Sequence, residues 1–369
     1  MSDENPRSLP LLHKLLLALL VGLVSAEAGV RLIDWRAGRT LETYLPPADP
    51  NKALMGLHPF MGYLYRPGAV KEGNVEAGGQ IVHINSRGMR GAELSSQKAP
   101  GTYRILCLGG STTFGSGASG DDTTYPARLE HYLNERAPAG VEYEVANCGV
   151  QGYSTAENLI YLQLLLVELE PDAIVIYQAA NDARPIQARN FKPDYTNIRR
   201  TWTDTVLSPF EEFMIRNVRL FVWLTRGTDE AVQLGTLGNP LFVPGFGDLH
   251  QRSNQIVPPE GIDVFFRNLN HMVLIAREHG IEPVLSTFAM CREQQQPNAE
   301  NFLETVATIN ARLGVYAAEK DVPLLRVAER LDGRCELFTD WMHLNDAGSD
   351  EHGRVAAEEA QRLGLFGLE

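Results

Sequence analysis

The sequence is short of positive charge and of cysteine, and each shortage argues against a class of protein. It has 33 Lys and Arg against 46 Asp and Glu, a formal net charge of −13. This argues against binding to a nucleic-acid backbone, which needs clustered cations. The four cysteines form no Cys-x-x-Cys pair, so a zinc ribbon or a thioredoxin-type motif is not expected. With 44% hydrophobic content in 369 residues, the chain can bury a full core, as one main domain with an attached segment.

A long uncharged run lies close to the N-terminus. Residues 15–26 are mostly Leu, Val and Ala, and this length suits the apolar core of a signal sequence better than a full membrane span. Ala-Glu-Ala at 26–28 resembles a cleavage site. Residues 11–33 can also span as one helix if the Lys14 ammonium reaches the membrane surface and Glu27 pairs with Arg31. Export is therefore predicted, and a cleaved signal and a retained anchor both stay open.

An alternation of apolar strands and amphipathic helices begins near residue 103. The predicted strands are 103–109, 142–147, 173–177, 282–287 and 323–325. The predicted helices are 125–136, 155–169, one with an apolar face at Phe302, Val306, Ile309, Leu313 and Tyr316, and a last one with a face at His352, Ala356, Ala360 and Leu363. Strands that alternate with helices predict a parallel five-stranded sheet covered by helices on both faces.

Two segments lie outside this alternation. Residues 45–98 are punctuated by Pro and Gly and predict a linker with a small strand-rich lead-in. Residues 185–262 are too long for a simple connection and predict an insertion after the third strand. Within it, 207–224 is rich in aromatic and aliphatic residues and 240–259 is loop-like; a substrate wall and a packing appendage both stay open. The expected divisions are a signal or membrane anchor at 1–36, a linker and lead-in at 37–100, and the main domain at 101–369.

Candidate catalytic residues follow four of the predicted strands. Ser111 comes after the first strand, Gly152 after the second, Asn181 after the third, and Asp340 and His343 after the fifth. In open parallel sheets, ligands bind beyond the carboxyl ends of the strands. A hydroxyl nucleophile needs a base, the base needs an orienting group, and the oxyanion needs hydrogen-bond donors. The sequence offers one candidate for every role and so predicts a serine esterase.

Each of these features alone is weak evidence for catalysis. A serine after two glycines often only caps a helix, and Asn181 with Asp182 can equally cap the turn that leaves the third strand. A metal site built from Asp182, Asp340 and His343 is conceivable, but no closely spaced histidines support it, so no metal and no cofactor is predicted. The joint placement of the candidates at one sheet edge is what favours a catalytic site.

Other classes of glycine-rich loop fit less well. Residues 115–120 match Gly-x-Gly-x-x-Gly, but a dinucleotide-binding turn would begin directly at the end of the preceding strand. A phosphate-binding P-loop would need Lys where Ser116 follows Gly115. The segment 109–113 lacks the second glycine of an α/β-hydrolase nucleophile elbow.

Taken together, four segments of the chain resemble the SGNH/GDSL hydrolase superfamily over about residues 103–365. They are Gly-Gly-Ser-Thr at 109–112, Gly-Val-Gln-Gly at 149–152, Ala-Ala-Asn-Asp at 179–182 and Asp-Trp-Met-His at 340–343. The resemblance implies a flavodoxin-like three-layer α/β/α sandwich. It also implies that Ser111 is the nucleophile, that His343 is the base, and that Asp340 holds the imidazole. The backbone N–H groups of Ser111 and Gly152, with the Asn181 side chain, would form the oxyanion hole.

The chain departs from the family pattern at two positions. Gly110 stands where the founding pattern has Asp, and Ala179 stands where the third segment usually has Gly, so the turn that presents Asn181 must tolerate a Cβ. Residues 84–91, Ile-Asn-Ser-Arg-Gly-Met-Arg-Gly, resemble a subgroup of exported bacterial SGNH proteins. This second resemblance implies an extracytoplasmic, carbohydrate-related role.

The expected protein is a membrane-anchored or secreted esterase with an extracytoplasmic catalytic domain, which removes a small acyl group such as acetyl from a carbohydrate. Its expected partners are an acylated glycan or small ester and, through the N-terminal segment, a membrane, but no nucleic acid. An O-acyltransferase that uses the same residues is the main alternative, and a non-catalytic glycan-binding scaffold is a further one. Cys107 and Cys148 are expected to be buried. Cys291 and Cys335 could pair in an exported domain or remain two free thiols.

Overall fold

The computed structural model describes residues 10–39, 54–73, 75, 78–95, 97–188, 191–197, 213–214, 217–226, 257–292 and 300–368. The chain divides into two compact units. One combines Met1–Asp49 with Thr201–Pro240, and the other combines Pro50–Arg200 with Leu241–Glu369.

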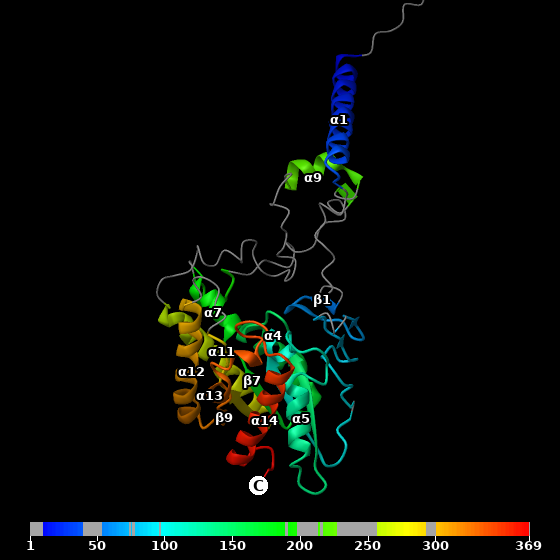
Figure 1. Cartoon of the computed structure of the whole chain (residues 1–369). Coiled ribbons are helices and arrows are strands. Elements are labelled where there is room, and N and C mark those ends of the chain that lie inside the picture. The colour runs from blue at the N-terminus through cyan, green and yellow to red at the C-terminus, as the bar shows by residue number, and fades with distance from the viewer. Residues whose placement is uncertain are drawn as a thin grey trace, which may run out of the picture. The chain divides into compact units, whose positions relative to one another are not determined.

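The larger unit is built on a five-stranded parallel sheet (Figure 1). Its strands lie in the order β6 (Glu142–Gly149), β5 (Thr102–Gly109), β7 (Ala173–Tyr177), β8 (Glu282–Ser286) and β9 (Leu324–Leu325). This is the strand order of flavodoxin-like folds. The chain leaves β5 toward β6 and then crosses to β7 on the other side, so the direction of winding reverses at β5. Ligands bind at such a switch point in open sheets.

The central strands are apolar on both faces, which made them easy to predict. Residues 105–108 of β5 have no exposed surface, and every residue of β7 is buried. A parallel strand covered on both faces appears in a sequence as a continuous apolar run. The observed strands accordingly agree closely with the predicted ones.

Helices cover both faces of the sheet. Right-handed crossovers place α5 (Tyr125–Asn134) on one face, and α6 (Thr155–Tyr161), α11 (Pro259–Glu278) and α12 (Glu300–Lys320) on the other. The last helix, α14 (Asp346–Leu363), packs along α5, and α11 packs against α6. The predicted three-layer α/β/α sandwich is confirmed.

Some helical details differ from the prediction. The strand-and-helix alternation did not include α11, because its start was assigned to the end of the insertion. The helix predicted at 155–169 is α6 followed by a π-helical turn at Leu162–Leu166 and a 3₁₀ turn at Val167–Leu169. On α14, Leu363 is exposed, since it occupies the last turn before the left-handed Gly364.

The predicted insertion is only partly described. Its first residues belong to α7 (Ala180–Gln187) and its last ones to α11. Most of the expected loop at 240–259 and much of 207–224 lie outside the described residues.

The lead-in forms two small antiparallel sheets. β1 (Met55–His58) pairs with β2 (Gly62–Tyr65), and β3 (Val70–Lys71) pairs with β4 (Val82–His83). Several of its side chains, among them Tyr63, Tyr65 and Met89, are buried in the same apolar core as the main sheet.

In the smaller unit, α1 (Leu11–Arg36) is long and apolar enough to cross a membrane. A signal sequence meets the same criteria. Glu27 and Arg31 form the expected ion pair at 2.7 Å. The carboxylate of Glu27 also accepts the backbone N–H groups of Arg219 and Leu220, at 2.9 and 2.7 Å, and so caps the start of α9 (Arg219–Arg226).

Candidate active site

Ser111 begins a single helical turn, α4 (Ser111–Phe114), directly after β5. The two glycines before it are required by close packing. A Cβ at Gly109 would collide with Thr113 and with the carbonyl of Tyr177, and a Cβ at Gly110 would collide with the side-chain nitrogen of Asn181. This collision explains why glycine suits position 110 in this chain, where the founding family pattern has Asp.

The structure brings Ser111, His343 and Asp340 into one hydrogen-bonded row. Nε2 of His343 lies 2.8 Å from Oγ of Ser111, and Nδ1 of His343 lies 2.7 Å from Oδ2 of Asp340. With the proton on Nδ1 donated to the carboxylate, Nε2 is left as an acceptor for the serine hydroxyl. This tautomer fits a base that takes the hydroxyl proton.

Asp340 is held by its own loop. Its Oδ1 accepts the N–H groups of Met342 and His343, at 2.9 and 2.8 Å. Burial raises the pKa of Asp340, but the hydrogen bond and charge of His343 and these two N–H groups outweigh it. The pKa of the carboxyl therefore lies below its ordinary value. The group is a carboxylate at neutral pH, as an acceptor for the imidazole N–H must be.

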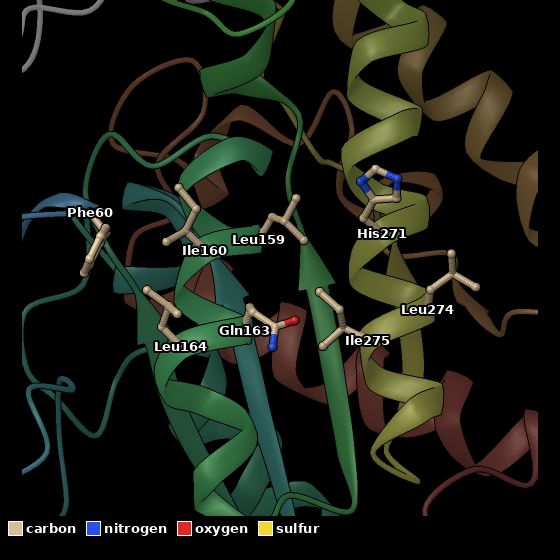
Figure 2. A pocket seen from close by; sticks show the side chains of 8 residues that line it. All are labelled: Phe60, Leu159, Ile160, Gln163, Leu164, His271, Leu274 and Ile275. Carbon is tan, nitrogen blue, oxygen red and sulfur yellow. The ribbon is translucent and has the colours of Figure 1, made fainter.

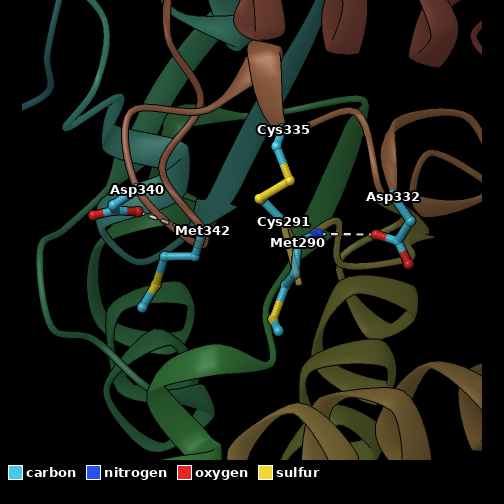
Figure 3. Close-up of a disulfide and its surroundings, with 6 residues drawn as sticks. All are labelled: Met290, Cys291, Asp332, Cys335, Asp340 and Met342. Atoms are coloured by element: carbon cyan, nitrogen blue, oxygen red, sulfur yellow. Dashed lines mark hydrogen bonds between the residues drawn. A yellow bond between two sulfur atoms is a disulfide. The ribbon is translucent and has the colours of Figure 1, made fainter. Parts of the chain in front are cut away.

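A disulfide ties this loop to the segment after β8 (Figure 3). Cys291 and Cys335 are bonded, with their Cα atoms 5.0 Å apart. The N–H of Cys291 donates to the carbonyl of Trp341 at 3.0 Å. Of the two possibilities left open by the sequence, the structure has the pair. Cys107 and Cys148 are free and buried, as expected.

The predicted oxyanion donors lie on the loops beside Ser111. Gly152 has φ 82°, in the left-handed region that favours glycine. Nδ2 of Asn181 donates one hydrogen bond to the carbonyl of Tyr153 at 2.9 Å and lies against Gly110. Ala179 has φ −167°, outside the left-handed region that favours glycine, so the turn that presents Asn181 does not need a glycine at this position.

The carboxylate of Asp182 makes no hydrogen bond to Ser111, His343 or Asp340 among those found in the described part of the chain. Its carboxylate accepts hydrogen bonds from the backbone and hydroxyl of Thr155, from Gln178 and from Tyr195. It therefore caps the start of α6. Burial raises the pKa of Asp182 to about 6, although these hydrogen bonds lower it. Among the described residues, no group of three or more His, Cys, Asp or Glu could hold a metal ion.

One contact between the loop after Ser111 and the segment after His343 is not predicted by the sequence pattern. The backbone N–H and hydroxyl of Ser119 donate to the carboxylate of Asp346, at 2.7 and 2.6 Å. Asp346 begins α14, three residues after His343. The loop after Ser111 is therefore hydrogen-bonded directly to the segment that carries His343.

The structure contains an apolar pocket of about 510 Å³ (Figure 2). It is lined by Phe60, Leu159, Ile160, Gln163, Leu164, His271, Leu274 and Ile275. These side chains come mainly from α6, from the π-helical turn that follows it and from α11. None of the predicted site residues lines the pocket.

A family model described as the GDSL-like Lipase/Acylhydrolase family matches residues 107–350. No protein of curated function matches the sequence.

Similar solved structures include a variant of an acetyl-xylooligosaccharide esterase from Geobacillus, with 15% identity and a TM-score of 0.43, covering 72% of this chain and 95% of that one. Another is a member of the lipolytic G-D-S-L family from Veillonella parvula, with 13% identity and a TM-score of 0.40, covering 71% and 97%. A third is a GDSL-like lipase from Bacteroides thetaiotaomicron, with 13% identity and a TM-score of 0.38, covering 70% and 88%.

Proposed function

Because the chain belongs to the GDSL-like lipase/acylhydrolase family and is therefore an ester-hydrolysing enzyme, we propose that it is a serine esterase acting through an acyl-enzyme on Ser111. The observation that carries this proposal is the row Ser111–His343–Asp340, with contacts of 2.8 and 2.7 Å. These distances lie within the range of a nucleophile bonded to its base and a base bonded to its orienting group.

In the first step, Oγ of Ser111 attacks the ester carbonyl while Nε2 of His343 takes the hydroxyl proton. The tetrahedral intermediate then collapses, the bond to the alcohol breaks, and His343 returns the proton to the leaving oxygen. Water next attacks the acyl-enzyme, with His343 again acting as base, and releases the acid and free Ser111. Asp340 stays ionised and stabilises the imidazolium in both steps.

We assign the oxyanion hole to the N–H groups of Ser111 and Gly152 and to the Asn181 amide. Nδ2 of Asn181 has two hydrogens, and the carbonyl of Tyr153 accepts one of them. The second can meet the oxyanion that develops beside Gly110. An amide suits this role because it donates a hydrogen bond and does not titrate.

For the substrate, we propose a small acyl ester, with acetyl as the first candidate, carried by a carbohydrate outside the cytoplasm. The apolar helix α1 is compatible with export. The Cys291–Cys335 disulfide suits an oxidising compartment. The carbohydrate itself is suggested by the resemblance of residues 84–91 to exported SGNH proteins.

A fluorophosphonate probe tests the proposal directly. We expect the probe to phosphonylate Ser111, identified by peptide mass spectrometry, and the Ser111→Ala variant to remain unlabelled. Hydrolysis of p-nitrophenyl acetate should fall by about a thousandfold or more in the same variant. Labelling elsewhere, with activity kept in Ser111→Ala, would refute the assignment. Incubation with acetylated and free oligosaccharides then separates release of acetate from transfer to a sugar hydroxyl, the reaction of an O-acyltransferase.

A further inference from the structure

The lead-in motif at residues 84–91 forms a tight turn that delivers Arg90 to the main sheet. Oδ1 of Asn85 accepts the N–H groups of Arg87 and Met89, both at 3.0 Å, and Gly88 takes a left-handed conformation with φ 80°. Arg90 then forms a β-bridge with Asn147 of β6. The motif therefore places one arginine at the outer edge of the main sheet, next to β6.

The side chain of Arg90 is completely buried and uses all its donors. Its guanidinium lies over the ring of Phe114, 5.0 Å from the centroid. Nε donates to the carboxylate of Asp121 at 2.8 Å. The remaining hydrogen bonds go to four backbone carbonyls, those of Phe114 (3.1 Å), Gly115 (2.7 Å), Ile81 (3.0 Å) and Gly120 (2.9 Å).

Two of these carbonyls belong to the nucleophile turn. Phe114 ends α4 and Gly115 follows it, so their carbonyls have no partner within the helix. Arg90 donates to both carbonyls, as cationic side chains do at helix C-termini. It does so together with Nδ2 of Asn147, which donates to the carbonyl of Phe114, and with the N–H of Ala118, which donates to that of Gly115. Because α4 is only one turn long, fixing its last residues also fixes the direction of Ser111 at its start.

A second contact from the lead-in reaches the oxyanion loop. The hydroxyl of Tyr63 donates to the carbonyl of Gln151. That carbonyl and the N–H of Gly152 belong to the same peptide group. The peptide is trans, since the described residues contain no cis bond, so its C=O and N–H point in opposite directions. Holding the carbonyl of Gln151 therefore sets the direction of the Gly152 N–H.

The same loop is held from its other side. The N–H of Gln151 donates to the hydroxyl of Tyr65 at 3.2 Å, and the ring of Tyr65 stacks on Phe114 with centroids 4.8 Å apart. The hydroxyl of Tyr153 donates to the carbonyl of Tyr63. The lead-in thus contacts both loops that supply backbone N–H groups to the proposed oxyanion hole.

We propose that Tyr63 and Arg90 are positioning residues for the ester hydrolysis: Tyr63 orients the Gly152 N–H toward the oxyanion, and Arg90 fixes the turn that carries Ser111. The proposal rests on the proposed function, because it requires that Ser111 be the nucleophile. It makes the lead-in a part of the catalytic apparatus and not a separate domain.

Tyr63→Phe is the sharpest test, because it removes one hydroxyl and keeps the ring. Its matched control is Tyr143→Phe. Tyr143 is also buried and donates to a backbone carbonyl, that of Phe366, at 2.9 Å, but it lies at the opposite end of the sheet.

The matched control for Arg90→Lys is Arg104→Lys. Arg104 is buried at the start of β5, and its side chain donates to Glu144, to Ser95 and to the carbonyl of Leu169.

We expect Tyr63→Phe to lower kcat for p-nitrophenyl acetate by about tenfold or more with little change in KM, since an oxyanion donor acts mainly in the transition state. Binding of a boronic acid, which mimics the tetrahedral intermediate, should weaken by a similar factor. Arg90→Lys should slow fluorophosphonate labelling of Ser111. The two control variants should lose thermal stability comparably but keep kcat and the labelling rate.

Wild-type kcat and boronate affinity in Tyr63→Phe would overturn the proposal for Tyr63 even if Arg90→Lys does not fold. A folded Arg90→Lys variant labelled at the wild-type rate would overturn it for Arg90. If the control variants lose as much kcat as Tyr63→Phe, the loss comes from general destabilisation and the proposal is wrong. A wild-type enzyme that the probe does not label at Ser111 would instead overturn the proposed function.

Discussion

Nε2 of His343 lies 2.8 Å from Oγ of Ser111, although 232 positions separate the two residues in the chain. Ser111 is placed by β5 and α4, and His343 by the loop between β9 and α14. The distance therefore depends on contacts between loops, such as the bond from Ser119 to Asp346 and the tie between Cys291 and the carbonyl of Trp341.

Asp340→Asn should lower kcat by about 10³–10⁴-fold with little change in KM, because an amide can bind the imidazole in the wrong tautomer without moving it. Steady-state kinetics with p-nitrophenyl acetate measure the loss. Asp332→Asn is the control, since Asp332 accepts the N–H of Met290 and touches neither Ser111 nor His343. Near-wild-type kcat in Asp340→Asn would refute the role of Asp340.

Asn181→Ala should reduce kcat by about 10²–10³-fold at nearly constant KM, the behaviour of a donor that acts in the transition state. Asn181→Asp keeps the size of the side chain but removes its N–H donors, so we expect a loss at least as large. Both variants need a Tm measurement, because the amide also bonds the carbonyl of Tyr153. Unchanged kcat in a folded Asn181→Ala variant would show that Asn181 only caps the turn after β7 and does not bind the oxyanion.

Replacing both Cys291 and Cys335 by Ser should lower the free energy of unfolding by about 2–5 kcal/mol. It should also lower kcat, because the N–H of Cys291 holds the carbonyl of Trp341, next to Asp340. Urea unfolding and steady-state kinetics give the two quantities. Dithiothreitol should reduce the activity of the wild type toward that of the double variant and leave the variant unchanged. A wild type indifferent to complete reduction would contradict this coupling.

Much of the fold could be predicted because its signals are local. Continuous apolar runs such as 173–177 become buried parallel strands, and the alternation with helices gives the sheet. The helix α11 was missed although its buried residues, such as Phe265, Leu269 and Met272, follow helical spacing. The helix begins at Pro259, and the sequence pattern of residues 240–259 predicts a loop. The π-helical turn at Leu162–Leu166 was missed because nothing in its apolar run distinguishes it from an α-helix.

The candidate site was predictable to the extent that its residues follow strand ends. Parallel strands bring their carboxyl ends to one edge, so Ser111, Gly152 and Asn181 could be grouped without a structure. The contacts of Tyr63 and Arg90 could not be predicted. Tyr63 reaches a carbonyl 88 positions away, and Arg90 reaches carbonyls 24 and 25 positions away. No periodicity encodes such contacts, because they depend on how the lead-in packs on the sheet.

Deleting residues 1–36 should give a soluble protein that keeps its activity. No helix after α1, among the described residues, is long and apolar enough to span a membrane. Sedimentation of membranes from cells that express the full and shortened chains measures the difference. A shortened chain that still sediments with membranes would contradict the prediction. It would point to α9, where Trp223 and Leu224 are exposed, as an interfacial element.

His352 should make the fold sensitive to acid without taking part in the reaction. Its ring is buried and stacks on Tyr125 with centroids 4.0 Å apart, and neither ring nitrogen has a hydrogen-bond partner within the described part of the chain. Burial lowers its pKa from 6.5 to about 3. Between these values the unfolded chain binds a proton that the folded chain does not, so the free energy of unfolding falls as the pH falls.

His352→Phe keeps the aromatic stacking and removes the titrating group, so its Tm should fall less than that of the wild type between pH 7 and about pH 4. The carboxyl of Asp182 works in the opposite direction. Its pKa is raised from 3.8 to about 6, so its contribution to stability is complete below 3.8 and is lost as the pH rises through about 6. The pH dependence of Tm in one protein therefore combines both groups. The effect of His352 is obtained by comparing the Tm of the variant with that of the wild type at each pH. His279→Phe, at an exposed position on the surface, is the control and should follow the wild type. If Tm falls by the same amount in His352→Phe and in the wild type, protonation of the buried imidazole does not cause the loss of stability in acid.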